Sequence, residues 1–403
     1  MRQILEGSQA IAQTINNIKP AVISAYPITP QTHIVEDLAK LKADGKANYE
    51  YIRAESEFAA ASIVAGASAT GVRVYTATSS QGLLLMTEVL FNIAGMRLPV
   101  VLTCANRGVS APITIWNDHQ DAMTIRDAGW IMFYAENHQE AVEQHILAYK
   151  IAEATKIPVM VNIDGFVLTH TYEPVKVPSR SQIKKFLPDY KPKKGQYLDP
   201  SRPVSLGTFA SPDYYMEIRE NLHKDLEQAQ NIINEEYKKY RKILGDFTKK
   251  NEKMTQINNG LIEYYGPRDA QTILVAMGSL VGTIKDVVDE QVKNTGLFGN
   301  KVGVLKIKTF RPFPAKEILK VVEKTKYVAV VEKAISLGST GPLALEIKNV
   351  TQGKTGPFGK LRTSKVQSFI VGLGGRDITS GMIKKIIKDV KNKDDSVKFI
   401  CKE

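Results

Sequence analysis

Five polar residues follow apolar runs in the first third of the chain, where their types could support binding of a small anion or a cofactor. In chain order they are Thr29, Glu57, Ser80, Arg107 and Asp118. If the apolar runs are parallel strands, their carboxyl ends meet at one edge of a sheet, which is where open α/β proteins bind ligands. Groups that can bind an anion and an isolated carboxylate would then lie close together at this edge.

Each of these residues also has an ordinary structural interpretation. Thr29, followed by Pro30, could cap a helix, although such a helix start would itself favour an anion. Glu57 lies near the start of an otherwise almost uncharged helix, and acidic residues favour the first turn anyway. Arg107 could form a surface ion pair. Their joint placement after successive strands is what favours a site.

The elements that must position these residues are short strands alternating with amphipathic helices. Candidate strands lie at residues 21–25, 49–53, 72–77, 99–105 and 157–163. Candidate helices lie between them, at residues 31–42, 57–69, 82–93 and 139–154. This alternation predicts a doubly wound α/β sheet that is mainly parallel. The run at 99–105 is apolar on both faces, which is typical of a strand buried on both sides.

Three regions are expected along the chain. Residues 1–175 hold the doubly wound domain. Residues 176–265 hold an irregular connection and a long charged helical arm whose sparse apolar residues indicate that one side lies on a domain or subunit. Residues 266–403 return to strand–helix alternation and form a second, smaller α/β domain. Its candidate strands lie at 272–277, 302–307, 327–331 and 368–372.

Composition excludes several classes of function. No window is apolar enough for a transmembrane helix and the N-terminus lacks the apolar run of a signal peptide, so we expect a cytoplasmic protein with no membrane contact. The net charge of +12 comes without any nucleic-acid-binding signature, so no nucleic-acid partner is expected. The two cysteines, Cys104 and Cys401, cannot ligate an iron–sulfur cluster, and the six histidines lack the spacing of a metal site.

The strand-end segments resemble the pyrimidine-domain motifs of the 2-oxoacid:ferredoxin oxidoreductases. The matching segments are Tyr26-Pro27-Ile28-Thr29-Pro30, Glu55-Ser56-Glu57, Ser79-Ser80-Gln81-Gly82-Leu83-Leu84-Leu85-Met86 and Asp118-His119-Gln120-Asp121. Later segments resemble the family's second domain: Phe310-Arg311-Pro312-Phe313, Val331-Glu332-Lys333 and Gly372-Leu373-Gly374-Gly375-Arg376-Asp377. The likeness spans nearly the whole chain and is closest to the separate alpha subunits of multi-subunit pyruvate synthases. It implies a thiamine-diphosphate-binding domain followed by a domain like the transketolase C-terminal module.

The resemblance also implies roles for individual residues. Glu57 matches the glutamate that hydrogen-bonds the aminopyrimidine ring of thiamine diphosphate and stabilises the imino tautomer, which removes the C2 proton of the thiazolium. Thr29 and Arg107 match residues at the substrate carboxylate, which suits a guanidinium fork. Ser80 and Gln81 lie in a segment that implies contact with the cofactor. Asp118 lies in a matching segment without an assigned chemical step.

Partner subunits are implied by what the sequence lacks. Thiamine-diphosphate enzymes hold Mg²⁺ and the diphosphate with a Gly-Asp-Gly…Asn motif, which does not occur here. The cofactor would therefore be shared with a beta subunit that supplies the diphosphate half, the Mg²⁺ and a [4Fe-4S] cluster. Gamma and delta subunits, or equivalents, would carry further clusters and contact coenzyme A. The chain alone is expected to be inactive.

The implied reaction converts pyruvate, coenzyme A and oxidised ferredoxin to acetyl-coenzyme A, CO2 and reduced ferredoxin. Three alternatives stay open at this point. The substrate could be another 2-oxoacid, such as 2-oxoisovalerate, 2-oxoglutarate or an aryl pyruvate. The chain could be a non-catalytic assembly subunit, although the retained Glu57 argues against this. It could also belong to an enzyme without electron transfer, similar to acetohydroxyacid synthase or transketolase.

Overall fold

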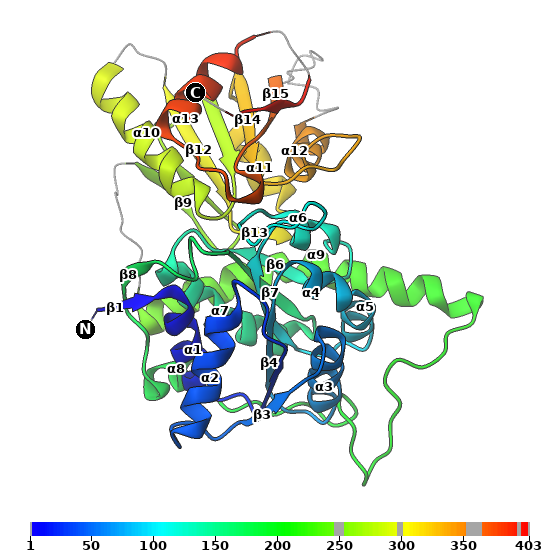
Figure 1. Cartoon of the computed structure of the whole chain (residues 1–403). Helices are drawn as coiled ribbons and strands as arrows, with labels where there is room; N and C mark the ends of the chain where they lie inside the picture. The colour runs from blue at the N-terminus through cyan, green and yellow to red at the C-terminus, as the bar shows by residue number, and fades with distance from the viewer. Residues whose placement is uncertain (1, 246–253, 296–300, 352–364, 393–395, 402–403) are drawn as a thin grey trace.

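Two seven-stranded sheets, each covered by helices, lie one above the other in the computed structural model (Figure 1). The structure describes residues 2–245, 254–295, 301–351, 365–392 and 396–401. The first sheet has the strand order β13-β6-β7-β5-β4-β2-β3, and the second has the order β16-β15-β14-β11-β12-β10-β9. A separate ribbon pairs β1 (Gln3–Glu6) with β8 (Tyr172–Val175). The predicted α/β class is confirmed.

The first sheet is parallel except at one edge. Its strands are β2 (Val22–Ala25), β3 (Glu50–Arg53), β4 (Val74–Thr78), β5 (Val101–Asn106), β6 (Ile131–Tyr134), β7 (Val159–Asp164) and β13 (Thr309–Arg311). Five of these lie where the sequence predicts strands. Sequence patterning does not single out β6, because a four-residue apolar run is too short to be distinguished from a buried helix segment.

Helices cover both faces of this sheet, as a doubly wound fold requires (Figure 1). They are α1 (Gly7–Ile18), α2 (Thr32–Ala43), α3 (Glu57–Ala69), α4 (Ser80–Leu85), α5 (Thr87–Gly95), α6 (Gln120–Thr124) and α7 (His138–Thr155). Every residue of the central strand β5 is buried, which explains why its sequence is largely apolar at consecutive positions. Strands β5, β4 and β2 are neighbours in the sheet and pair in parallel, so their carboxyl ends lie side by side at one edge.

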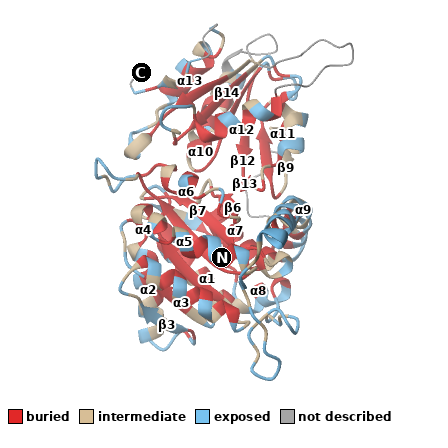
Figure 2. Cartoon of the chain, turned by 90° about the vertical axis from the view of Figure 1, so that its right-hand side faces the viewer, coloured by how far each residue is buried: buried red, intermediate tan, exposed pale blue. Residues whose placement is uncertain are grey.

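The middle of the chain forms α8 (Arg180–Phe186) and the long helix α9 (Pro212–Leu244). One stripe of α9 is buried against the first domain, where α9 packs on α7, while its other side is exposed (Figure 2). The buried residues recur at helical spacing and are Leu222, Ala229, Ile233, Glu236, Tyr237, Tyr240 and Leu244. Residues 246–253 of the expected 176–265 region lie outside the described residues.

The second sheet is mixed, with antiparallel pairs at the β9–β10–β12 side and parallel pairs elsewhere. Its strands are β9 (Thr255–Asn258), β10 (Ile262–Tyr265), β11 (Thr272–Ala276), β12 (Val302–Ile307), β14 (Tyr327–Glu332), β15 (Lys365–Ile370) and β16 (Lys398–Phe399). Its helices are α10 (Leu280–Thr295), α11 (Ala315–Val322), α12 (Pro342–Thr351) and α13 (Ser380–Asp389), with a 3-10 turn, η2, at Leu373–Gly375.

Two features join the sheets. Strand β13 follows β12 in the chain but pairs antiparallel with β6 of the first sheet. Beside it, the buried Lys306 ammonium lies 2.7 Å from carboxylate oxygens of both Glu136 and Glu140. The two sheets are thus connected by a shared strand and by buried charge. No helix in the described ranges is both long and apolar enough to cross a membrane.

Candidate active site

Glu57 opens α3 at the carboxyl end of β3. The preceding Ser56 caps the helix, because its hydroxyl accepts a hydrogen bond from the backbone N–H of Ala59 at 3.1 Å. Glu57 itself is only 7% exposed. Its carboxylate nevertheless has no hydrogen bond or ion pair with any residue that the structure describes. A carboxylate so nearly buried is normally paired, so this one is a candidate for contact with a ligand.

The neighbour of Glu57 is the first turn of α4. A Cβ added at Gly82 would come within 2.5 Å of both Oε1 of Glu57 and Oγ1 of Thr78, so only glycine allows this approach. Three buried polar atoms at the junction of β4 and α4 find no hydrogen-bond partner among the described residues: Thr78 Oγ1, Ser79 Oγ and Gln81 Nε2. Unsatisfied buried polar atoms are rare in native proteins, and three together beside a free carboxylate indicate a ligand with complementary polar groups.

Ser80 is fully buried and its polar groups are used within the chain. Its hydroxyl lies 2.7 Å from the carbonyl oxygen of Gly108 and 2.6 Å from Oε1 of Gln81, so it can donate to one of them at a time. Its backbone N–H donates to Asp121. Ser80 therefore orients its neighbour Gln81, whose Nε2 stays available to a ligand.

Asp121 is the residue that joins the strand ends. Its Oδ2 accepts backbone N–H bonds from Ser80 at 3.0 Å and from Arg107 at 2.9 Å, while Oδ1 accepts from Asn106 Nδ2 at 2.9 Å. Complete burial raises the pKa of Asp121 to about 6, against these hydrogen bonds, which lower it. The sequence contained Asp121 within a matching segment but gave it no role, because nothing in the spacing shows which carboxylate turns inward.

Arg107 and Thr29 meet at this edge. The guanidinium of Arg107 donates from Nη1 to the carbonyl oxygen of Thr29 at 2.9 Å and from Nε to that of Thr114 at 2.6 Å. No acidic side chain in the described part of the chain pairs with it. Carbonyl contacts orient the guanidinium without neutralising it, so its charge is available to an anion.

The expected helix cap by Thr29 is wrong. Helix α2 begins at Thr32 and Gln31 occupies its N-cap position. The side chain of Gln31 instead ties two loops together, because Nε2 donates to the carbonyl oxygen of Ala77 at 2.7 Å and Oε1 accepts from the backbone N–H of Ile28 at 3.3 Å. Thr29 is therefore left in the exposed turn between β2 and α2.

Asp118, the last of the five residues, contacts the second domain. Its Oδ1 accepts from the backbone N–H of Gln120 at 3.0 Å, and its Oδ2 accepts from the backbone N–H of Gly374 at 3.1 Å. Asp118 therefore has a structural contact across the junction between the two sheets.

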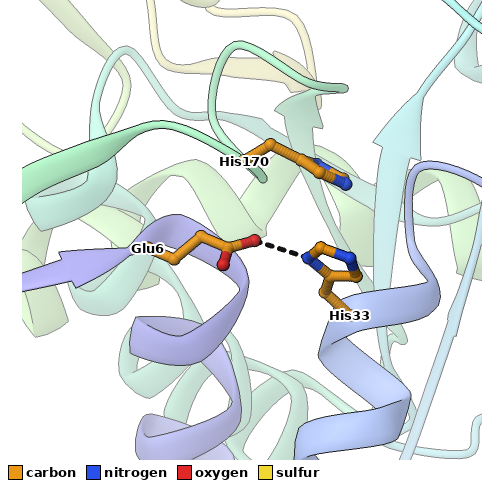
Figure 3. Close-up of side chains that lie close together, drawn as sticks. All are labelled: Glu6, His33 and His170. Atoms are coloured by element: carbon orange, nitrogen blue, oxygen red, sulfur yellow. Dashed lines mark hydrogen bonds and ion pairs between the residues drawn. The ribbon is translucent and has the colours of Figure 1, made fainter.

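Two histidines far apart in the sequence lie together at the rim of this edge (Figure 3). His33 Nδ1 shares a 2.6 Å hydrogen bond with Glu6, and the rings of His33 and His170 stack at 4.3 Å. Nδ1 of His170 shares a 2.6 Å hydrogen bond with the Thr169 hydroxyl. These three side chains, Glu6, His33 and His170, have ligand atoms within 4.8 Å of one another, a grouping that sequence spacing did not reveal.

An uncharged surface adjoins Glu57. The outward side of α3 carries Phe58, Ala59, Ser62, Ile63, Gly66 and Ala67. Phe58 is 40% exposed, and Leu85 on the neighbouring α4 is 51% exposed. Exposed apolar residues without intervening charge are typical of the core of a protein–protein interface. The free carboxylate thus lies next to a surface suited to another polypeptide.

Comparison with known proteins agrees with this geometry. Residues 14–238 match a family model described as pyruvate flavodoxin/ferredoxin oxidoreductase, thiamine-diphosphate-binding, and residues 270–383 match pyruvate:ferredoxin oxidoreductase core domain II. Pyruvate synthase subunit PorA of Methanothermobacter thermautotrophicus is 44% identical over 400 residues, covering 99% of this chain and 97% of that protein. The PorA subunit of Methanocaldococcus jannaschii is 45% identical, with coverage of 99% and 97%.

Two further matches widen the range of substrates among the relatives. Ketoisovalerate oxidoreductase subunit VorA of Pyrococcus horikoshii is 40% identical over 396 residues, covering 97% of this chain and 94% of that protein. A solved structure of 2-oxoglutarate:ferredoxin oxidoreductase from Magnetococcus marinus superposes with a TM-score of 0.70 at 20% identity. The match covers 97% of this chain and 65% of that longer chain, and at this identity it shows the shared fold alone.

Proposed function

Because the chain belongs to the pyruvate:ferredoxin oxidoreductase family, we propose that it is the alpha subunit of an enzyme that oxidatively decarboxylates pyruvate. Pyruvate, coenzyme A and two oxidised ferredoxin equivalents give acetyl-coenzyme A, CO2, a proton and two one-electron-reduced ferredoxins, and the reverse direction is pyruvate synthesis. The observation that carries the proposal is the nearly buried carboxylate of Glu57 beside Gly82, which pairs with no side chain among the residues that the structure describes.

Glu57 fits the pyrimidine side of thiamine diphosphate. When bound, that cofactor supplies a nucleophilic carbon and an electron sink for cleavage next to a ketone. The Glu57 carboxylate, which has no partner in the described part of the chain, would accept a hydrogen bond from the ring and hold the proton that favours its imino form. The buried polar atoms of Thr78, Ser79 and Gln81 that lack a hydrogen-bond partner among the described residues would face the same ring.

The substrate carboxylate is assigned to Arg107 and Thr29. The guanidinium is held by two backbone carbonyls and forms no ion pair with an acidic side chain of the described residues. A 2-oxoacid placed there would present its carboxylate, which leaves as CO2, to the arginine. Among the candidate cofactor contacts, Gln81 is assigned a direct hydrogen bond, whereas Ser80 acts by orienting Gln81.

The remaining parts of the reaction are assigned to partner subunits. Two cysteines in the whole sequence are too few to ligate a [4Fe-4S] cluster, so the electrons must leave through another chain. The uncharged face of α3 beside Glu57 is where a beta subunit, with the diphosphate, Mg²⁺ and a cluster, would close the site. Gamma and delta subunits or equivalents would complete the path to ferredoxin and contact coenzyme A, in the cytoplasm.

A second candidate substrate is 2-oxoisovalerate, because a ketoisovalerate oxidoreductase subunit is 40% identical over almost the whole chain. A hydrophobic pocket often discriminates such acids by only about 1–3 kcal/mol per methylene. The test is to purify the complex through a tag on this chain and to compare kcat/KM for pyruvate, 2-oxoisovalerate and 2-oxoglutarate. We expect a brown complex that prefers pyruvate. Isolation of a colourless chain with no 2-oxoacid-dependent reduction of ferredoxin would contradict the proposal.

A further inference from the structure

Two segments that resemble the family's second domain, residues 331–333 and 372–377, both contact the loop that orients Arg107. From these contacts we infer that the second domain positions the substrate-binding arginine, with Lys333 as the positioning residue. The inference rests on the proposed role of Arg107. The loop concerned spans residues 108–119 and precedes α6, which lies at the junction of the two sheets (Figure 1).

Lys333 directly follows β14 and reaches across the junction. Its ammonium donates to Asn117 Oδ1 at 2.9 Å and to Asp164 Oδ2 at 2.8 Å, and its own carbonyl oxygen accepts the backbone N–H of His119 at 2.8 Å. Lys333 is 5% exposed and Asp164 is 1% exposed. One residue of the second domain thus holds the loop at two points and also pairs with the end of β7.

The 3-10 turn η2 adds two backbone contacts. The N–H of Gly374 donates to Asp118 Oδ2 at 3.1 Å, and the N–H of Gly375 donates to the carbonyl oxygen of Asn117 at 2.6 Å. A Cβ at Gly375, where φ is +79°, would come within 2.3 Å of the Cβ of Trp116. The loop therefore lies directly against the backbone of the second domain.

The inner side of the same loop holds the arginine. The N–H of Gly108 donates to the carbonyl oxygen of Trp116 at 3.0 Å, and Nε of Arg107 donates to that of Thr114 at 2.6 Å. Asn117 Nδ2 also donates to the carbonyl oxygen of Asn106, the last residue of β5, at 3.2 Å. Movement of residues 114–117 would therefore shift the carbonyl that sets the direction of the guanidinium.

The charge of Lys333 matters because its partner is buried. Asp164 is also bound by His119 Nε2 at 2.6 Å and by the backbone N–H of Ser279 at 3.0 Å. Although burial favours the protonated acid, Lys333 and His119 hold the pKa of Asp164 well below its usual value. Removing Lys333 alone would leave a buried carboxylate short of compensation, so a test needs a variant that removes both charges.

The test compares the double variant Lys333→Met/Asp164→Asn with Asn117→Ala in the assembled complex. Asn117→Ala removes the side chain that accepts from Lys333, together with its Nδ2 bond to the carbonyl oxygen of Asn106, and keeps the Lys333–Asp164 ion pair, so it also serves if the double variant folds poorly. We expect both to raise the KM for pyruvate at least tenfold with a smaller change in kcat, and to leave the rate of cofactor C2-proton exchange unchanged. Lys384→Met/Glu290→Gln, which removes an exposed 2.7 Å ion pair of the second domain, is the control.

A background variant separates positioning from a merely structural role. If Lys333 acts through Arg107, adding the double substitution to Arg107→Met produces no further rise in KM, because two substitutions that act through the same interaction with the substrate are not additive. If the double variant kept the wild-type KM and its kcat fell only in proportion to the amount of assembled complex, the inference would be overturned, while the role of Arg107 would stand. An unchanged KM in Arg107→Met alone would overturn the proposed role of Arg107 and this inference with it.

Discussion

The carboxylate of Glu57 lies directly against the backbone of Gly82, so closely that a Cβ at residue 82 would come within 2.5 Å of Oε1. The two residues come from successive strand-to-helix turns of the first sheet, at the starts of α3 and α4. This contact fixes the direction of a carboxylate that has no other partner among the described residues.

Gly82→Ala is expected to disable cofactor activation, because the methyl group would displace both Glu57 and Thr78. Overpacking of this kind typically costs about 1–3 kcal/mol of folding free energy, so the complex should still assemble. The measurement is the thiamine-diphosphate-dependent reduction of ferredoxin, with Gly282→Ala as a control at a helical glycine that has open space around it. Wild-type activity in Gly82→Ala would show that the Glu57–Gly82 contact is unimportant.

Asp121→Asn tests the residue that joins the strand ends. Asn has one acceptor oxygen in place of two, so its NH2 group must face either the backbone N–H groups of Ser80 and Arg107, which share Oδ2, or the side-chain amide of Asn106 at Oδ1. At least one buried donor then loses its partner, at a cost of about 1–3 kcal/mol. We expect a lower Tm together with loss of both cofactor activation and pyruvate affinity, since Asp121 contacts both halves of the site. Asp127→Asn, at an exposed carboxylate, is the control. If Asp121→Asn lowered only cofactor activation or only pyruvate affinity, the proposal that Asp121 joins the two parts of the site would be contradicted.

Arg107→Met should weaken use of the substrate. A hydrogen bond to a charged group contributes about 1.5–3 kcal/mol, so kcat/KM for pyruvate should fall about 10- to 100-fold. Most of the fall is expected in KM, because the carboxylate is bound before it leaves. Arg97→Met, which removes a guanidinium paired with Asp225 away from the site, is the matched control. An equal kcat/KM in wild type and Arg107→Met would refute the assignment.

The buried charges between the sheets predict a dependence of stability on acid pH. Glu263 is desolvated, which raises its pKa, but Lys306 and Lys285 outweigh this and lower the pKa from 4.5 to about 2. A carboxylate with a depressed pKa contributes stability that is present above its unfolded value and is lost as the pH falls through the folded value. The free energy of unfolding should therefore decline as the pH falls from about 4.5 towards 2, as denaturant titrations would measure.

Glu263→Gln should flatten this decline, whereas Glu290→Gln, at a carboxylate whose side chain is 44% exposed, should leave it as in the wild type. The same steepness in Glu263→Gln and wild type would mean that other groups dominate the acid transition.

Sequence patterning was sufficient for the fold class and for most strands of the first sheet, because alternation of apolar runs with amphipathic stretches is a local signal. It also placed Thr29 and Arg107 at one edge, where the structure shows the guanidinium bonded to the Thr29 carbonyl. The helix cap was wrong because the side chain of Gln31 bonds to β4, a contact between residues 46 positions apart.

Contacts across the junction could not be predicted for the same reason. Lys333 and Asp164 are 169 residues apart, and their pairing depends on how two sheets pack, which has no periodic signature in the sequence. The grouping of Glu6 and His33 with His170 is likewise a consequence of the tertiary fold. The resemblance of residues 331–333 to the family marked the segment, but only the structure shows what Lys333 touches.

The most direct test of the account is the rate of C2-proton exchange on thiamine diphosphate bound to the assembled complex, compared between wild type and Glu57→Ala. Glu55→Ala is the matched control, since Glu55 is an exposed carboxylate two residues away. We expect exchange to collapse in Glu57→Ala and to persist in Glu55→Ala, with the cofactor still bound in both. Exchange at the wild-type rate in Glu57→Ala would contradict the central claim.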